Sequence, residues 1–163
     1  MKRMIMLIFL FVASMGILGF VMCTSTRSGE KSPDEVLDDF HDAASKADGT
    51  RYFSLFAEGA IFLGTDGTER WTVKEFKEYA NPFFDQGRGW TYTKKSRHVY
   101  FSRNGNTAWF DEVLENAKYG ECRGSGVLIK SGEVWKITQY NLTIPIPNSL
   151  AGSVVEKIRN ENR

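Results

Sequence analysis

The fold is decided by residues 90–144, which read WTYTKKSRHVYFSRNGNTAWFDEVLENAKYGECRGSGVLIKSGEVWKITQYNLTI. Apolar and polar side chains alternate along this stretch with the period of a β-strand, and turn signals divide it into segments of about ten residues. We expect strands over 90–102, 107–115, 121–130 and 133–144. Asn104-Gly105 favours a tight hairpin turn, and the prolines after residue 144 end the last strand. The stretch therefore predicts an antiparallel meander.

The sequence before this stretch has the period of a helix. Ser32, Pro33 and Glu35 combine an N-cap serine, a proline at the first helical position and a glutamate three residues after the cap, which is a capping box. The apolar face of the helix that follows is formed by Val36, Leu37, Phe40, Ala43, Ala44 and Ala47.

A second capping box, Thr72 to Glu75, starts another helix, which Pro82 ends or kinks. We expect a short helix over 51–56 and a short strand over 60–63 between the two, and a final short helix capped by Asn148. Helices followed by long antiparallel strands indicate an α+β fold with the helices packed on one face of a sheet.

Length and charge restrict the function. The chain has 163 residues, 42% hydrophobic and 25% charged, which fits one globular domain. The formal net charge is +1, and it becomes −1 when Lys2 and Arg3 are set aside. A nearly neutral chain lacks the broad basic field that non-specific binding to nucleic acid or anionic lipid requires. We therefore expect no nucleic-acid partner.

The N-terminus predicts export. Lys2 and Arg3 precede an uncharged apolar stretch that ends at Cys23, so residues 1–23 are interpreted as a signal peptide or an N-terminal membrane anchor. Residues 24–31 are small and polar, which is typical of a linker. We expect the domain over 32–150 and a C-terminal tail or short helix over 151–163. The domain would then be periplasmic or anchored outside the cytoplasm, with membrane contact only through the N-terminal segment.

The two cysteines offer little chemistry. Cys23 is a candidate lipoprotein cysteine, but Phe20 to Met22 before it lack the small side chains that lipoprotein processing usually requires, and we favour an apolar cysteine at the end of a membrane segment. After cleavage only Cys122 remains, so an intramolecular disulfide is impossible.

Four strings carry a family resemblance: FLGTDGTERWT at 62–72, AWFDE at 108–112, YGECRGSGVLIK at 119–130 and WKITQYNLTIPIPN at 135–148. They resemble SnoaL-like domains of the nuclear-transport-factor-2-like (NTF2-like) superfamily, in a branch with no assigned chemistry. The resemblance implies a cone-shaped fold in which helices fill the mouth of a strongly curved, mostly antiparallel sheet and leave a pocket. It also implies the homodimer common in the superfamily. Because the superfamily contains isomerases, cyclases, dehydratases, hydrolases and non-catalytic binding modules, the fold does not select the function.

Strand parity places candidate pocket residues, because side chains two positions apart share a face. In 133–144, the inward face of Trp135 and Ile137 continues to Gln139 and Asn141. In 121–130, the parity of Val127 and Ile129 predicts that Arg123 also points inward.

A buried Arg123 requires a carboxylate partner. The preceding strand offers Glu112, or Asp111 if a bulge shifts the register. We favour Glu112 because its face is otherwise apolar. Such a cross-strand pair more often fixes register than catalyses a reaction. Trp71 and Tyr79 belong either to the core or to the mouth of the cup, where they would suit a flat apolar ligand.

The sequence contains no phosphate loop, dinucleotide fingerprint or nucleophile elbow, so we expect no cofactor. The histidines, His41 and His98, and Cys122 do not stand at ligand spacing, so we expect no metal site.

Three classes of function remain. The first is an exported binding or accessory domain that holds a small apolar molecule, with Arg123 and the two amides of Gln139 and Asn141 at its polar end. The second is a cofactor-free isomerase, cyclase, dehydratase or hydrolase, in which Glu112 or Asp111 moves a proton and Arg123 or Gln139 stabilises an oxyanion. The third is a structural dimer whose cup is filled. We favour binding, because an arginine partner lowers the pKa of a carboxylate that proton transfer would need raised.

Overall fold

The computed structural model describes residues 30–161, so the predicted signal peptide or anchor lies outside the described residues. The elements are α1 (Pro33–Ser45), α2 (Gly49–Ser54), β1 (Phe56–Leu63), β2 (Arg70–Thr72), α3 (Val73–Phe84), β3 (Thr93–Phe101), β4 (Thr107–Asn116), β5 (Gly120–Ser131), β6 (Val134–Thr143) and α4 (Asn148–Glu161). None of the helices within 30–161 is long and apolar enough to cross a membrane.

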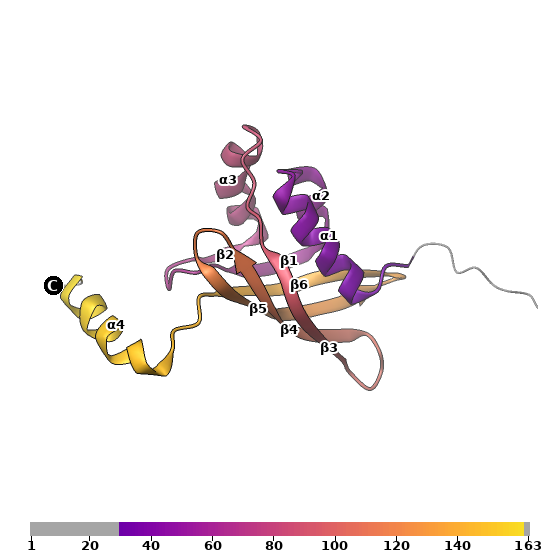
Figure 1. Cartoon of the computed structure of the whole chain (residues 1–163). Coiled ribbons are helices and arrows are strands. Elements are labelled where there is room, and N and C mark those ends of the chain that lie inside the picture. The colour runs from indigo at the N-terminus through magenta and orange to yellow at the C-terminus, as the bar shows by residue number, and fades with distance from the viewer. Residues whose placement is uncertain (1–29, 162–163) are drawn as a thin grey trace, which may run out of the picture.

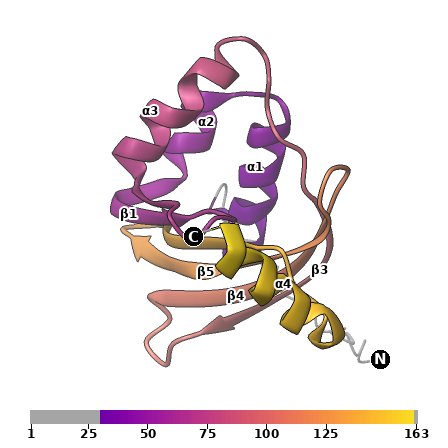
Figure 2. The same cartoon turned by 90° about the vertical axis from the view of Figure 1, so that its left-hand side faces the viewer.

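The architecture confirms the α+β prediction. One six-stranded sheet has the order β2-β1-β6-β5-β4-β3, and β3 to β6 form the predicted antiparallel meander. β1 pairs with β2 antiparallel and with β6 in parallel. The sheet is curved and open, and α1, α2 and α3 all lie on one side of it (Figures 1 and 2).

Local signals fix where the helices begin. Ser32 caps α1 and Thr72 caps α3, and both complete the predicted capping box with a glutamate three residues later. Pro82 lies inside α3, which continues to Phe84. In the hairpin between β3 and β4, Gly105 has a φ of 70°, a conformation that glycine adopts without strain.

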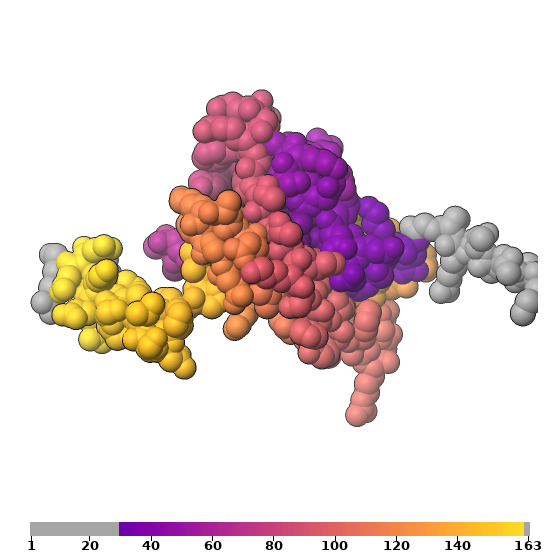
Figure 3. Space-filling model, in the orientation of Figure 1, coloured from indigo at the N-terminus to yellow at the C-terminus, as the bar shows by residue number. Residues whose placement is uncertain are grey.

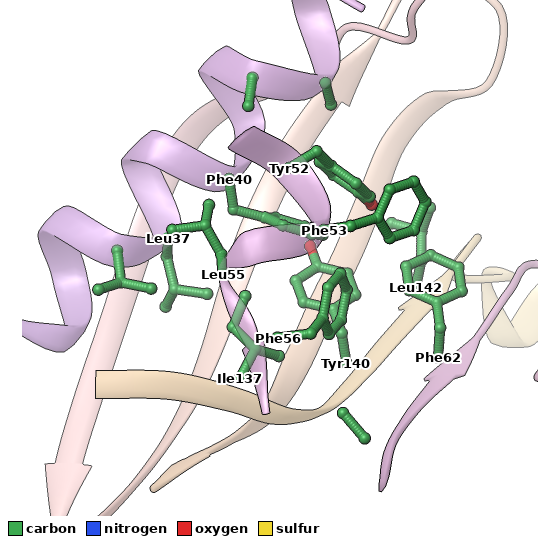
Figure 4. Packing of buried hydrophobic residues seen from close by; sticks show 14 of the residues in the cluster. Leu37, Phe40, Tyr52, Phe53, Leu55, Phe56, Phe62, Ile137, Tyr140 and Leu142 are labelled. Atoms are coloured by element: carbon green, nitrogen blue, oxygen red, sulfur yellow. The ribbon is translucent and has the colours of Figure 1, made fainter. Parts of the chain in front are cut away.

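Aromatic rings form most of the core between the helices and the sheet. Phe40 of α1 stacks on Tyr52 of α2 with ring centres 4.5 Å apart, and lies 4.8 Å from Tyr140 of β6. Figure 4 shows these rings packed with Phe53 and Phe56 between α1, α2 and the sheet. Buried residues of α3 belong to the same cluster, so the core joins all three helices to the sheet.

The inward face of β5 differs from the prediction. The buried residues are Cys122, Gly124, Gly126 and Leu128, so the predicted inward orientation of Arg123, Val127 and Ile129 is wrong. Two of the inward positions are glycines. Because glycine has no side chain, the alternation of apolar side chains does not show that this face of β5 is the buried one.

β6 contains an irregularity that reverses its parity. Trp135 and Ile137 are buried as predicted, but the register against β5 shifts by one residue at Thr138. Beyond this bulge Tyr140 and Leu142 are the buried residues. Gln139 and Asn141 consequently face away from the helices, opposite to the prediction.

The last helix stands apart from the body. No residue of α4 is buried, and Leu150, Val155 and Ile158 expose apolar side chains. Figure 3 shows α4 (yellow) projecting from the end of β6 without covering the sheet. The packed part of the protein therefore ends with β6.

Candidate functional site

A cavity of about 240 Å³ opens between α3 and the neighbouring ends of β1 and β6. Its walls are mainly aromatic. The rings of Trp71 and Tyr79 stack 4.9 Å apart, and Trp71 lies 5.5 Å from Phe76. The cavity is lined by Phe62, Gly64, Thr65, Glu69, Trp71, Phe76, Tyr79, Phe83, Trp90, Tyr92, Tyr119 and Leu142. Flat aromatic walls of this kind suit a flat apolar molecule.

A small chamber of about 10 Å³ adjoins the cavity on the side of the core. Four residues line both spaces: Phe62, Trp90, Tyr92 and Leu142. The chamber adds Phe40, His41, Tyr52 and Tyr140. Three of these added residues, His41, Tyr52 and Tyr140, therefore bring polar groups to the inner end of the apolar cavity.

Glu112 lies directly behind this chamber and is 1% exposed. Its Oε1 lies 2.9 Å from His41 Nε2 and accepts a 2.7 Å hydrogen bond from the hydroxyl of Tyr140. Its Oε2 accepts a hydrogen bond from Arg97 Nε at 2.8 Å. Both carboxylate oxygens are thus held by side chains from α1, β3 and β6.

Arg97 connects this carboxylate to the surface of α1. Its side chain is almost fully buried, and Nη1 contacts Asp34 Oδ1 and Asp38 Oδ1, each at 2.8 Å. Lys94 pairs with Asp38 at 2.6 Å. The guanidinium is therefore balanced by one buried and two half-exposed carboxylates, which favours its burial.

These contacts set the charge of Glu112. Burial raises the pKa of its carboxyl, but the hydrogen bond and charge of His41, the charge of Arg97 and the Tyr140 hydroxyl together outweigh burial and lower the pKa. Glu112 is consequently ionised near neutral pH. Burial raises the pKa of Tyr140 well above its usual value, so its hydroxyl remains a donor.

The contact with Glu112 fixes the orientation of the His41 ring. Nε2 of His41 is hydrogen-bonded to Glu112, whereas Nδ1 makes no hydrogen bond within residues 30–161. An imidazole held by a buried carboxylate has a defined tautomer and orientation, which is the condition for exchanging a proton with a bound molecule. No cluster that could hold a metal ion exists among the described residues.

The structure brings together only part of the predicted site. Trp71 and Tyr79 line the cavity, and Glu112 is buried behind its inner end. Arg123 is exposed on the outer face of the sheet, opposite Val113. The predicted ion pair between Arg123 and Glu112 is therefore wrong: the buried cation beside Glu112 is Arg97.

The other predicted polar residues also lie on the outer face. Asp111 contacts His98 at 3.2 Å, with both side chains exposed. Gln139 pairs with Val127 and Asn141 with Ser125, both on this outer face. The bulge at Thr138 is the physical reason that these two amides do not point into the cup.

The predicted site residues did not include Arg97, His41 or Tyr140. Sequence patterns point to two of them, Arg97 and His41. Counting outward from Asn104-Gly105 along both strands of the hairpin places Arg97 opposite Glu112, as the register shows. His41 lies four residues after Leu37 and three before Ala44, on the apolar face of its helix. A histidine on the apolar face of a helix needs a buried polar partner, and the predicted buried carboxylate of Glu112 was the available one.

The fold and the cavity define a class of protein: an open, curved sheet with helices over one face is the NTF2-like fold, also described as cystatin-like. Residues 34–147 match the family model described as a SnoaL-like domain, and the chain belongs to this family. The resemblance found in the sequence is therefore confirmed. No curated protein matches the chain.

Solved structures share the fold at low sequence identity. An NTF2-like protein of unknown function from Pseudomonas putida KT2440 has a TM-score of 0.59 and 9% identity, over 71% of this chain and 85% of that one. A candidate scytalone dehydratase from Novosphingobium aromaticivorans DSM 12444 has a TM-score of 0.56 and 12% identity, over 69% and 81%. A candidate ketosteroid isomerase from Shewanella frigidimarina NCIMB 400 has a TM-score of 0.53 and 18% identity, over 66% and 90%.

Proposed function

We propose that this protein binds a small, flat, apolar molecule in the aromatic cavity between α3 and the sheet. The observation that carries the proposal is the cavity of about 240 Å³ with stacked rings in its wall. Ligand sites are typically apolar clefts with a few polar groups at one end, and here those groups are supplied by the inner chamber. An open cavity does not favour the alternative of a filled cup.

Two tyrosines provide a matched test. Tyr79 stacks on Trp71 at the cavity and is 49% exposed, whereas Tyr100 stacks on Trp109 on the outer face of the sheet and is 47% exposed. Because both are half exposed, neither Tyr79→Ala nor Tyr100→Ala should unfold the protein. We expect Tyr79→Ala to weaken binding of indane, a flat apolar probe, about fivefold in calorimetric titration, because a cavity wall is lost.

Tyr100→Ala is expected to leave the affinity for indane unchanged. Equal affinities for indane in wild type and in both variants would contradict binding at this cavity. So would a larger loss of affinity in Tyr100→Ala than in Tyr79→Ala.

A second candidate function is proton transfer without a cofactor, as in an isomerase, cyclase, dehydratase or hydrolase. It is favoured by the contact of His41 with an ionised, buried Glu112. In this reaction His41 takes a proton from a carbon beside a carbonyl, and the electron pair of the C–H bond forms an enolate. The imidazolium of His41 then exchanges this proton with solvent and returns a proton to the carbon, which restores the carbonyl and the neutral histidine. The candidate enzymes that share the fold are consistent with this chemistry.

Deuterium exchange tests this second candidate, with a second histidine as the control. His98 also contacts a carboxylate, Asp111, but lies exposed on the outer face. We expect wild type and His98→Gln to accelerate exchange of the protons beside the carbonyl of indanone in heavy water, and His41→Gln to lose this acceleration. Absence of acceleration by the wild type would contradict this candidate while leaving the binding proposal intact.

We also propose that the domain works outside the cytoplasm, because residues 5–23 form an uncharged apolar stretch after Lys2 and Arg3. Cell fractionation tests this: the protein should be found in the periplasm or on a membrane. Recovery of the chain from the cytosol with its first residues intact would contradict export.

A homodimer is a further proposal. Tyr100 and Trp109 expose stacked rings on the outer face of the sheet, 5.9 Å apart. Light scattering is expected to give the mass of a dimer for the wild type and a smaller mass for Trp109→Lys. A monomeric wild type would contradict it.

A further inference from the structure

The buried hydroxyl of Tyr52 is the polar group of the inner chamber that the protein itself leaves unpartnered. Tyr52 is 0% exposed, and its Oη makes no hydrogen bond with the described residues. Burial raises the pKa of this hydroxyl well above its usual value, so it keeps its proton. A buried hydroxyl without a partner destabilises a protein, and its presence therefore requires an explanation.

The Tyr52 hydroxyl can donate a hydrogen bond, but it has no acceptor among the described residues. The indole N–H of Trp90 lies close enough to lower the pKa of Tyr52, although the two groups do not form a hydrogen bond of normal geometry. An indole can only donate, so even a closer approach of Trp90 would leave the Tyr52 proton without an acceptor. What the site lacks is an oxygen that accepts this hydrogen bond.

Other polar side chains line the same chamber. Tyr92 and Tyr140 interact electrostatically with Tyr52, and both line the chamber together with His41. Figure 4 shows the hydroxyl oxygens of Tyr52 and Tyr140 (red) among the packed rings. The chamber volume of about 10 Å³ is close to the space that one oxygen atom or one water needs.

We propose that the chamber is a subsite for a single carbonyl or hydroxyl oxygen at one end of the ligand, and that Tyr52 donates the hydrogen bond that holds it. This proposal rests on the proposed binding function and deepens it, because it names the ligand class: a flat apolar body with one terminal oxygen. The body occupies the aromatic cavity, and the oxygen reaches through the residues shared by the two spaces, Phe62, Trp90, Tyr92 and Leu142.

The test compares indane with indanone, which adds one carbonyl oxygen to the same two-ring skeleton. Both are titrated by calorimetry into wild type, Tyr52→Phe and Tyr100→Phe. Tyr52→Phe keeps the ring and removes only the unpartnered hydroxyl, so we expect the variant to fold with unchanged or increased stability. Tyr100 is exposed on the outer face, and its variant controls for the loss of a tyrosine hydroxyl elsewhere.

We expect Tyr52→Phe to weaken indanone binding about fivefold, the effect of one net hydrogen bond, and to leave indane binding unchanged. Tyr100→Phe should change neither affinity. Equal indanone affinity in wild type and Tyr52→Phe, with indane still bound, would overturn the subsite and leave the proposed function standing. Binding of neither compound to the wild type would overturn both.

Discussion

Replacing Glu112 with glutamine tests whether the buried carboxylate holds the network behind the cavity. Oε2 of Glu112 accepts from Arg97 Nε, and Oε1 accepts from Tyr140. An amide has one oxygen and one NH2 group, so Glu112→Gln cannot accept hydrogen bonds at both positions. It also removes the negative charge that faces the buried guanidinium of Arg97.

The expected loss of stability can be estimated from these contacts. Removing one partner of a buried ion pair typically costs about 3–5 kcal/mol, because a buried charge is left behind. Arg97 keeps Asp34 and Asp38 at 2.8 Å, so we expect the lower end of this range, about 3 kcal/mol. Urea unfolding followed by tryptophan fluorescence would measure the difference.

Glu115 on the same strand provides the control. It pairs with Lys95, and both side chains are about half exposed. Because exposed ion pairs contribute little, Glu115→Gln should cost about 0.5 kcal/mol or less.

The pH dependence gives a second measure of the same interaction. The pKa of Glu112 is lower in the folded protein than in the unfolded chain, so its stabilisation is fully present above the unfolded pKa of about 4.3 and is lost as the pH falls through the folded value. The free-energy difference between wild type and Glu112→Gln should therefore shrink in acid. A loss below about 1 kcal/mol near neutral pH, or a difference that stays constant down to about pH 3, would refute the reasoning.

Three further changes test other parts of the fold by unfolding measurements. Gly124→Ala would place a methyl group 2.6 Å from Glu112 Oε1 and against the Tyr140 hydroxyl, so it should lower the free energy of unfolding by about 2–3 kcal/mol. Gly67→Ala is the control, because its methyl group points into open space, and it should cost less than about 0.5 kcal/mol. Equal losses in the two variants would contradict the close approach at Gly124. Thr72→Ala removes the N-cap of α3 and should cost about 1 kcal/mol, and an unchanged melting temperature would count against the capping box. Deleting residues 148–163 should change the unfolding free energy by less than about 0.5 kcal/mol, because none of the described residues of α4 is buried; a larger loss would mean that α4 packs on the domain.

Much of the fold could be predicted because its signals are local. The capping boxes at Ser32 and Thr72 place the starts of α1 and α3, and Asn104-Gly105 places the hairpin between β3 and β4. Each of these features depends on a few neighbouring residues.

The site was harder to predict because it depends on parity across the sheet. On β5 the inward positions include Gly124 and Gly126. Only glycine leaves room there for the Glu112 side chain at the first position and for the backbone carbonyl of Gln139 at the second. The apolar side chains of Val127 and Ile129, which lie on the outer face, then led to the wrong prediction of which face of β5 is buried. On β6 one extra residue, Thr138, reverses the face that follows, and no local pattern marks it.

The parallel pairing of β1 with β6 determines when the cavity can form during synthesis of the chain. Phe62 of β1 and Leu142 of β6 both line the cavity, although 80 residues separate them in the sequence. This long-range pair can close only after the last strand has left the ribosome, and closing so long a loop carries a large entropic cost. Until then the apolar faces of α1 and α3 lack part of the sheet that buries them. The cavity of a growing chain is therefore incomplete until nearly all of the domain is available, and the apolar faces of its helices are open to aggregation during that interval.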